Sequence, residues 1–583
     1  MATYPVFDLR KQMVLDGFWD FCWLEQKVSL QDFSPAQIEQ YPEKTAVPSV
    51  FDLYVTRFQK RGLGVYRKWI DGMTGTCFRL HAEGLGLAGR IFWDGKEIGQ
   101  ADYPYAALDF DFKSHSAERH ELVIAVDNRF ESQKYPFMRD FYDFYAFGGI
   151  YRSMTLYQVP DLFLDRVHVR TVDEICGKVQ LEIFVRGDIQ AGQNLDISYH
   201  FDHTAEKTVT LFFENGRAVA EFTVPDHHLW EPDDPHLHLL HLTLPVNGDR
   251  ITERFGIRRL DWNGRHLLLN GKKLYLRGVN RHCSHAEFGP VESPMLIADD
   301  LNYLKTAGFN FIRCVHYPHN QAFFDLCDEM GFLCWEETLG WGLSSKGDLV
   351  EEVLPFFLEQ NRKMLHASMN HPAVIIWGYL NECASHLPES VSFYQALTRA
   401  VHEQDFSRPV SYASNRKEFD VCFDAADLIA INCYPGWFED ITDSVTLASD
   451  LIEPHLKRMA EYFDQDAFRN KPLIISEIGV CGLAGVRDWN KVQWSEDFQA
   501  DYMVEACRAT EQNPRYCGFA LWQMFDSRSY NRGQIRGKPK GFNCAGLLDE
   551  YRRPKLAYFM VKDYFRQHGV PDERIEKNET GKI

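Results

Sequence analysis

Two glutamates in the C-terminal half of the chain each stand directly after an apolar run. Glu382 follows residues 374–381 and Glu477 follows residues 472–476. Glycoside hydrolysis needs two such carboxyl groups, because one acid protonates the leaving oxygen while a second carboxylate attacks the anomeric carbon. A separation of about 5–5.5 Å between them is typical of the retaining mechanism. We therefore predict that Glu382 and Glu477 form a glycosidase pair.

Eight apolar segments beyond residue 259 alternate with helical stretches, a rhythm typical of a parallel sheet with crossover helices. The predicted strands cover residues 274–279, 309–313, 333–336, 374–380, 410–413, 428–432, 473–477 and 518–522. Eight strands in about 250 residues indicate a (β/α)8 TIM barrel, whose catalytic groups project from the C-terminal strand ends. The alternative is an open doubly wound sheet, but no Gly-rich phosphate turn opens a helix.

Hydrogen-bonding side chains end or directly follow each of these segments. For one isolated carboxylate, an N-cap or a surface charge would be the more probable interpretation, whereas eight consecutive strand ends of this kind favour a site. The groups are Asn280-Arg281-His282, Arg313 with His316, Glu336-Glu337, Asn381-Glu382, Ser414-Asn415, Asn432 with Tyr434, Glu477 and Trp522-Gln523.

The N-terminal half has short apolar runs broken by Gly, Asp, Asn and Pro, which are strand and turn signals. A chain of 583 residues exceeds a single core, so several domains are expected. We predict a sugar-binding-like jelly-roll β-sandwich at 1–160, an immunoglobulin-like β-sandwich at 161–258 and the catalytic TIM barrel at 259–583.

The composition excludes several classes of partner. A formal net charge of −20 disfavours binding to nucleic acid or to an anionic membrane. The N-terminus has no signal-peptide pattern and no apolar run approaches the roughly 20 residues of a bilayer span, so we expect a cytoplasmic protein. Fourteen scattered cysteines show neither a CxxC pair nor a ligand rhythm. We therefore predict neither a disulfide framework nor a zinc site. We also expect no cofactor.

Six motifs are specific in their order and spacing. They are Arg277-Gly-Val-Asn-Arg-His, Arg313-Cys-Val-His-Tyr-Pro, Leu326-Cys-Asp-Glu-Met-Gly, Asn370-His-Pro-Ala-Val-Ile-Ile-Trp, Leu380-Asn-Glu and Phe147-Gly-Gly-Ile-Tyr-Arg. With these motifs the chain resembles glycoside hydrolase family 2, the family of β-galactosidases and β-glucuronidases, over nearly its whole length. The resemblance implies a retaining exo-β-glycosidase with Glu382 as acid/base and Glu477 as nucleophile, in agreement with the strand count.

The resemblance also implies roles for residues around the two glutamates. Asn381 would bind the sugar 2-hydroxyl, Tyr434 would hydrogen-bond the nucleophile and Trp522 would form the floor under the sugar ring. The ionised nucleophile is expected to raise the pKa of Glu382. The remaining predicted substrate-binding residues are Asp143 on a first-domain loop, His282, His316, Asn432 and Asn543. For His282 and His316 the alternative is a structural role on a loop.

The sugar is less defined. β-Glucuronidases read the substrate carboxylate with an Asn-x-Lys motif before a glycine, and here that stretch is Asn543-Cys544-Ala545-Gly546. The missing lysine favours a neutral β-galactoside, with a β-glucuronide or β-galacturonide as the alternative. The basic residues Arg532, Arg536, Lys538 and Lys540 either supply a different carboxylate clamp or belong to a solvated loop.

The galactosidase pattern departs at the same place, because its sodium-binding asparagine falls on Ala545, so no metal is carried over. The expected partner is a small glycoside or oligosaccharide, and a homo-oligomer is possible. A different class of function, a carbohydrate-binding protein on an inactive hydrolase scaffold, is disfavoured by the intact Glu382 and Glu477.

Overall fold

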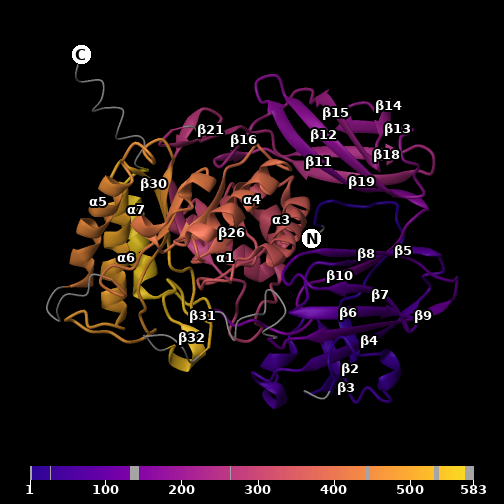
Figure 1. Cartoon of the computed structure of the whole chain (residues 1–583), viewed down its shortest axis with the longest axis horizontal. Helices are drawn as coiled ribbons and strands as arrows, with labels where there is room; N and C mark the ends of the chain where they lie inside the picture. The colour runs from indigo at the N-terminus through magenta and orange to yellow at the C-terminus, as the bar shows by residue number, and fades with distance from the viewer. Residues whose placement is uncertain are drawn as a thin grey trace.

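The computed structural model describes residues 3–25, 28–130, 143–262, 264–439, 447–530 and 538–570. Two β-sandwiches come first along the chain and a closed barrel with its helices follows (Figure 1). This architecture confirms the predicted fold class. The domain limits 1–160, 161–258 and 259–583 remain a prediction.

The first sandwich consists of two antiparallel sheets. One sheet has the order β1 (Gln12–Val14), β10 (Met154–Gln158), β5 (Cys77–Ala82) and β8 (Leu108–Lys113). The other has the order β3 (Glu43–Val47), β2 (Gly17–Leu24), β4 (Leu63–Asp71), β9 (Arg119–Asp127), β6 (Ala88–Trp93) and β7 (Lys96–Ala101). Its core contains Trp19, Phe78, Ile91 and Ile124, all at most 1% exposed.

The second sandwich has seven strands in two sheets. Three are β11 (Leu162–Asp173), β12 (Lys178–Gly187) and β15 (Arg217–Thr223), and four are β14 (Lys207–Phe213), β13 (Gln193–Phe201), β18 (His238–Leu244) and β19 (Asp249–Phe255). Burial along β18 alternates residue by residue, as expected of a strand with one face on the core.

The barrel closes through eight parallel strands. They are β23 (Leu276–Arg281), β24 (Phe311–Cys314), β25 (Leu333–Glu337), β26 (Val374–Asn381), β27 (Val410–Ser414), β28 (Ile429–Asn432), β29 (Leu473–Ile478) and β30 (Tyr516–Leu521). Each begins and ends within two residues of its prediction. Strands this apolar are typical of a sheet buried on both faces.

Helices cover the outside of the barrel. They are α1 (Pro294–Ala307), α2 (Gln321–Met330), α3 (Leu354–Ser368), α4 (Val391–His402), α5 (Ile452–Tyr462), α6 (Glu496–Glu511) and α7 (Leu556–Gln567). The caps of α1 are typical, since Ser293 accepts a hydrogen bond from the Leu296 amide and Gly308 ends the helix at φ 93°. Between β27 and β28 the crossover has the 3₁₀ turns η6 (Lys417–Phe419) and η7 (Phe423–Ala425) in place of an α-helix.

Polar contacts join the sandwiches to each other and to the barrel. Arg10, from the segment before β1, pairs with Asp249 of the second sandwich at 2.9 Å. The Asn370 side chain accepts a hydrogen bond from the Val169 amide of β11 and donates one to the Val167 carbonyl of the same strand. Arg152 donates to the Pro318 carbonyl at 2.8 Å. The first sandwich is thereby fixed against the face of the barrel where the strands end. No described helix combines the length and apolar character needed to cross a membrane.

Candidate active site

A cavity of about 560 Å³ opens where the barrel strands end. Of the ten residues predicted for the site, eight line this cavity. They are Asp143, His316, Glu382, Asn432, Tyr434, Glu477, Trp522 and Asn543. The structure therefore brings residues from the first sandwich and from five barrel strand ends to one place.

Glu477 is held through both carboxylate oxygens. Oε1 accepts from the Arg313 guanidinium at 2.7 Å, and Oε2 accepts from the Tyr434 hydroxyl at 2.5 Å. Burial raises the pKa of Glu477, while Arg313 and Tyr434 oppose that rise. Two such donors favour the carboxylate and fix its orientation toward the cavity.

Glu382 follows β26 in the left-handed backbone region at φ 52°. Such a conformation is uncommon for a residue other than glycine and recurs at functional sites. Its Oε1 accepts from the Asn432 side chain at 3.0 Å. The pKa of Glu382 is raised to about 7. Desolvation by burial is the largest cause of this rise, and the negative charge of the neighbouring Glu477 is the second. The pKa of Glu382 therefore shifts in the expected direction, but burial contributes more to the rise than the charge of Glu477.

Arg313 lies at the centre of the polar network and is 0% exposed. Besides Glu477 it pairs with Glu337 at 2.7 Å and donates to the Asn381 side-chain oxygen at 2.9 Å. Sequence reasoning placed Arg313 at a strand end without assigning it a role. The available signal was an arginine within the apolar strand Phe-Ile-Arg-Cys, because a buried guanidinium requires carboxylate partners.

Asn381 lies next to the cavity lining. Its side-chain oxygen accepts from Arg313 and from Asn432, at 2.9 and 3.1 Å. Within the part of the chain that the structure describes, its buried Nδ2 has no hydrogen-bond partner. The amide therefore has a donor to offer beside Glu382.

His316 and Trp522 form one wall, with nearly parallel rings whose centroids are 5.6 Å apart. Burial and the Arg313 charge hold the pKa of His316 well below its usual value, so the imidazole is neutral near pH 7.

His282 does not lie where a substrate-binding residue was predicted. It lies outside the cavity lining, with its ring 5.4 Å from His316 and Nδ1 3.2 Å from the Tyr317 hydroxyl. Its contacts with His316, Trp522 and Tyr317 indicate that it supports this wall from behind the lining.

Asp143 reaches the cavity from the first sandwich. The loop that carries it docks on the barrel, where the Tyr145 amide donates to the Arg528 carbonyl at 2.9 Å. Gly149 lets the loop pack closely on its own sandwich, because it has φ 149° and a Cβ there would lie 2.4 Å from the Ser49 carbonyl oxygen. A Cβ on Gly148 would lie 2.4 Å from Asn128 Cβ, so close packing accounts for both glycines of the Phe147-Gly-Gly motif.

Lys538 lines the same cavity. It belongs to the basic stretch 532–540, of which the structure describes residues 538–540. Its Nζ lies 3.1 Å from Asp143 Oδ2, and its side chain is 10% exposed. Lys540 is exposed and does not belong to the lining, while Arg532 and Arg536 lie outside the described residues. One cation of the basic stretch is therefore directed into the site.

The outer wall carries residues that sequence reasoning missed. Aromatic side chains predominate, and Lys417 pairs with Glu439 across two loops. These residues come from the loops after β25, β27 and β28, which have no periodic pattern that would mark them. The wall comprises Trp341, Arg416, Lys417, Phe419, Trp437, Phe438 and Glu439.

Two family models match parts of the chain. Residues 261–568 match the family model "Glycosyl hydrolases family 2, TIM barrel domain", and residues 162–258 match "Glycosyl hydrolases family 2". A β-glucuronidase of Canis lupus familiaris is 28% identical over 79% of this chain and 70% of its own length. A β-glucuronidase of Streptococcus agalactiae is 24% identical over 99% of both chains.

A solved β-galacturonidase from Eisenbergiella tayi, bound to galacturonate, superposes with a TM-score of 0.87. It is 28% identical to this chain and covers 98% of it and 99% of its own length. The relatives thus include enzymes named for two uronic acids.

Proposed function

The chain belongs to glycoside hydrolase family 2, and we propose that within this family it is a retaining exo-β-hexuronidase. It would release a terminal β-linked galacturonic or glucuronic acid from small glycosides or oligosaccharides. The relatives' names and the position of Lys538 in the cavity support a uronide over the β-galactoside that the missing lysine favoured.

The reaction proceeds by two displacements. Glu477 attacks the anomeric carbon while Glu382 gives its proton to the aglycone oxygen, which breaks the glycosidic bond and leaves a glycosyl ester on Glu477. Glu382, now a carboxylate, takes a proton from water, and that water cleaves the ester to release the sugar with its original anomeric configuration. A pKa of about 7 suits Glu382 to both steps.

The neighbouring residues position these groups. Arg313 and Tyr434 keep Glu477 ionised and aimed at the anomeric carbon. The Asn381 amide donates to the sugar 2-hydroxyl, and such a contact strengthens as the oxocarbenium-like transition state forms. His316 and Trp522 pack against the ring, and Asn432 holds Glu382.

The position of Lys538 carries the choice of sugar. Ala545 and Asn543 line the cavity, so the segment with the missing lysine lies in the same cavity that Lys538 enters from farther upstream. A uronate carboxylate bonded to Nζ gains a charge-assisted hydrogen bond of about 1.5–3 kcal/mol. Asp143 holds the ammonium in place without consuming its three donors.

A comparison of p-nitrophenyl glycosides tests the proposal. We expect kcat/KM on the β-galacturonide or the β-glucuronide to exceed that on the β-galactoside by about 10- to 150-fold, because a neutral sugar lacks the carboxylate that would bond Lys538 beside Asp143. Equal or higher kcat/KM on the galactoside would refute the uronide assignment and leave the two-glutamate chemistry intact.

Replacing Lys538 by methionine should affect only acidic sugars. We expect kcat/KM on the preferred uronide to fall by about 10- to 150-fold, the equivalent of a lost bond of about 1.5–3 kcal/mol, with less than about 3-fold change on a neutral glycoside. The exposed Lys540 provides the matched control, since Lys540→Met removes an equal charge outside the cavity. A Lys538→Met variant that loses activity equally on both sugars would contradict sugar-specific recognition.

A further inference from the structure

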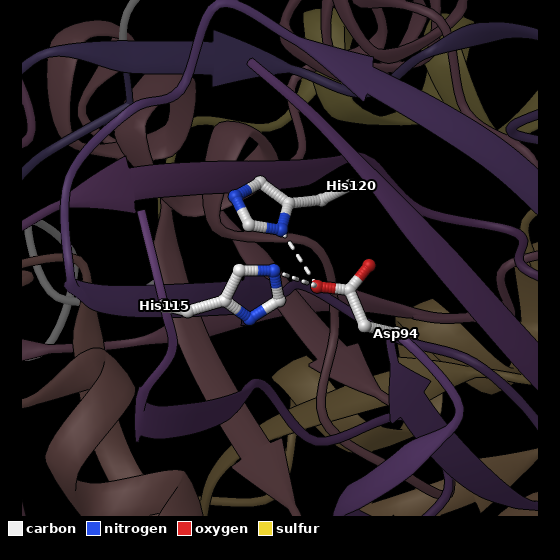
Figure 2. Close-up of side chains that lie close together, drawn as sticks. All are labelled: Asp94, His115 and His120. Carbon is white, nitrogen blue, oxygen red and sulfur yellow. Dashed lines mark hydrogen bonds and ion pairs between the residues drawn. The ribbon is translucent and has the colours of Figure 1, made fainter. Parts of the chain in front are cut away.

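A cluster of two histidines and one aspartate lies in the first sandwich, apart from the cavity lining. Asp94 stands in the turn between β6 and β7, His115 in the connection from β8 to β9, and His120 in β9. Figure 2 shows both imidazole rings turned toward one carboxylate oxygen of Asp94. A turn and a strand of one sheet thus meet the connection that arrives from the other sheet.

The donor atoms are close enough to share an ion. His120 Nδ1 is 2.7 Å and His115 Nε2 is 4.0 Å from Asp94 Oδ2. One ligand atom from each residue lies within 4.8 Å of the other two. Around a tetrahedral ion with metal–ligand bonds of about 2.0–2.2 Å, neighbouring ligand atoms lie farther apart than the His120–Asp94 pair and closer than the His115–Asp94 pair. Small side-chain rotations would therefore bring all three groups to an ion.

Two of the three groups are already fixed by the fold. The Glu121 amide donates to Asp94 Oδ1 at 2.8 Å, which leaves Oδ2 directed at the histidines. His120 is 0% exposed, and its ring lies 4.7 Å from that of Trp93. The exposed His115 is the group that can close over an ion. This arrangement reduces the ordering that binding requires.

We propose that Asp94, His115 and His120 bind a divalent transition-metal ion, of which Zn²⁺ is the best match. Two imidazoles and a carboxylate suit Zn²⁺ and its neighbours, whereas Mg²⁺ and Ca²⁺ prefer oxygen ligands. Three protein ligands leave a coordination position for water. The ion joins the β6–β7 turn to the connection between the two sheets and stabilises the first sandwich.

A second group of metal-ligand residues, Asp325, Asp328 and His371, serves as a contrast. Asp325 pairs with Arg254 at 2.8 Å, and Asp328 pairs with His371 Nδ1 at 2.6 Å. His371 Nε2 contacts the Gln321 side-chain oxygen at 3.0 Å. Arg254 and Gln321, which lie outside this group, therefore occupy two of its residues. In the first cluster Asp94 and His120 also pair, at 2.7 Å, but the exposed His115 lies 4.0 Å from Asp94 and can turn toward an ion.

Zinc titration of chelator-treated protein, followed by calorimetry and by metal analysis after dialysis, tests the site. We expect His115→Ala and Asp94→Asn to bind one equivalent of Zn²⁺ fewer than the unaltered chain. A matched control, His203→Ala, removes an exposed histidine of the second sandwich and should bind the full number. The difference of one equivalent separates this site from other histidines on the surface.

Thermal unfolding gives a second readout. Excess Zn²⁺ should raise the Tm of the unaltered chain and of His203→Ala by about 2–4 °C, and that rise should be absent in His115→Ala. Equal zinc stoichiometry in His115→Ala and the unaltered chain would overturn the proposal, as would an unaltered chain that binds no zinc. Neither readout depends on glycosidase activity, so the metal site and the proposed function can fail separately.

Discussion

Glu477→Gln is expected to lower kcat on an aryl β-hexuronide by about 10⁴- to 10⁶-fold, the range seen when an enzyme loses its nucleophile. The amide has nearly the same shape as the carboxylate but cannot form the glycosyl ester. Because Arg313 still finds an oxygen at this position, the fold should persist. Initial rates and the Tm of the variant, measured side by side, check both expectations.

Glu336 provides a matched control for this substitution. It is a buried glutamate at the end of β25, and burial raises its pKa to about 8, so it is largely protonated at pH 7. Glutamine mimics that neutral acid, and Glu336→Gln should keep kcat within about 3-fold. Near-normal turnover by Glu477→Gln, or equal losses in the two variants, would refute the role assigned to Glu477.

Glu382→Gln is expected to have the second largest effect, and its size should depend on the aglycone. The variant cannot protonate the leaving oxygen, so an alkyl glycoside should lose about 10²- to 10⁴-fold in kcat/KM. A dinitrophenyl glycoside, whose leaving group needs no proton, should lose far less in the first step. Rates on the two aglycones measure this difference directly.

The pH profile provides an independent test of Glu382. Glu382 must be protonated to act as the acid, so activity should fall as the pH rises through about 7. Glu477 must be ionised, so activity should also fall at low pH, below its raised pKa. The basic limb should vanish in Glu382→Gln while the acidic limb remains. A basic limb that persists in the variant would assign the acid to another group.

Much of the barrel could be predicted from the sequence. Strands such as β26 are continuous apolar runs, and a run of that kind that ends in Asn381-Glu382 reveals both the element and the side chains at its end. The family motifs then agreed with the strand count. Local pattern was sufficient here because barrel chemistry lies where strands end.

Contacts between distant segments could not be predicted in the same way. Asp143 and Lys538 are 395 residues apart in sequence and meet only because the first sandwich docks on the barrel mouth. His282 and His316 both follow strand ends, yet only His316 reaches the cavity lining. Which of two adjacent rings faces the substrate depends on tertiary packing, which a motif does not encode.

The sugar shows the same limit. Ala545 removed one lysine from the expected motif, and sequence reasoning therefore favoured a neutral sugar. In the folded chain the cavity still receives an ammonium group, because Lys538 approaches from a neighbouring segment. A charge needed at a point in space can be supplied from more than one position in the sequence.

Covalent trapping tests the central claim most directly. Incubation with a 2-deoxy-2-fluoro-β-hexuronosyl fluoride should slow the second displacement and leave the glycosyl ester on the protein. Intact mass should rise by one fluorohexuronosyl group, and peptide mapping should place the label on Glu477, with no label in Glu477→Gln. A label on another residue, or an unlabelled chain that continues to hydrolyse uronides, would contradict the assignment of a retaining hexuronidase with Glu477 as its nucleophile.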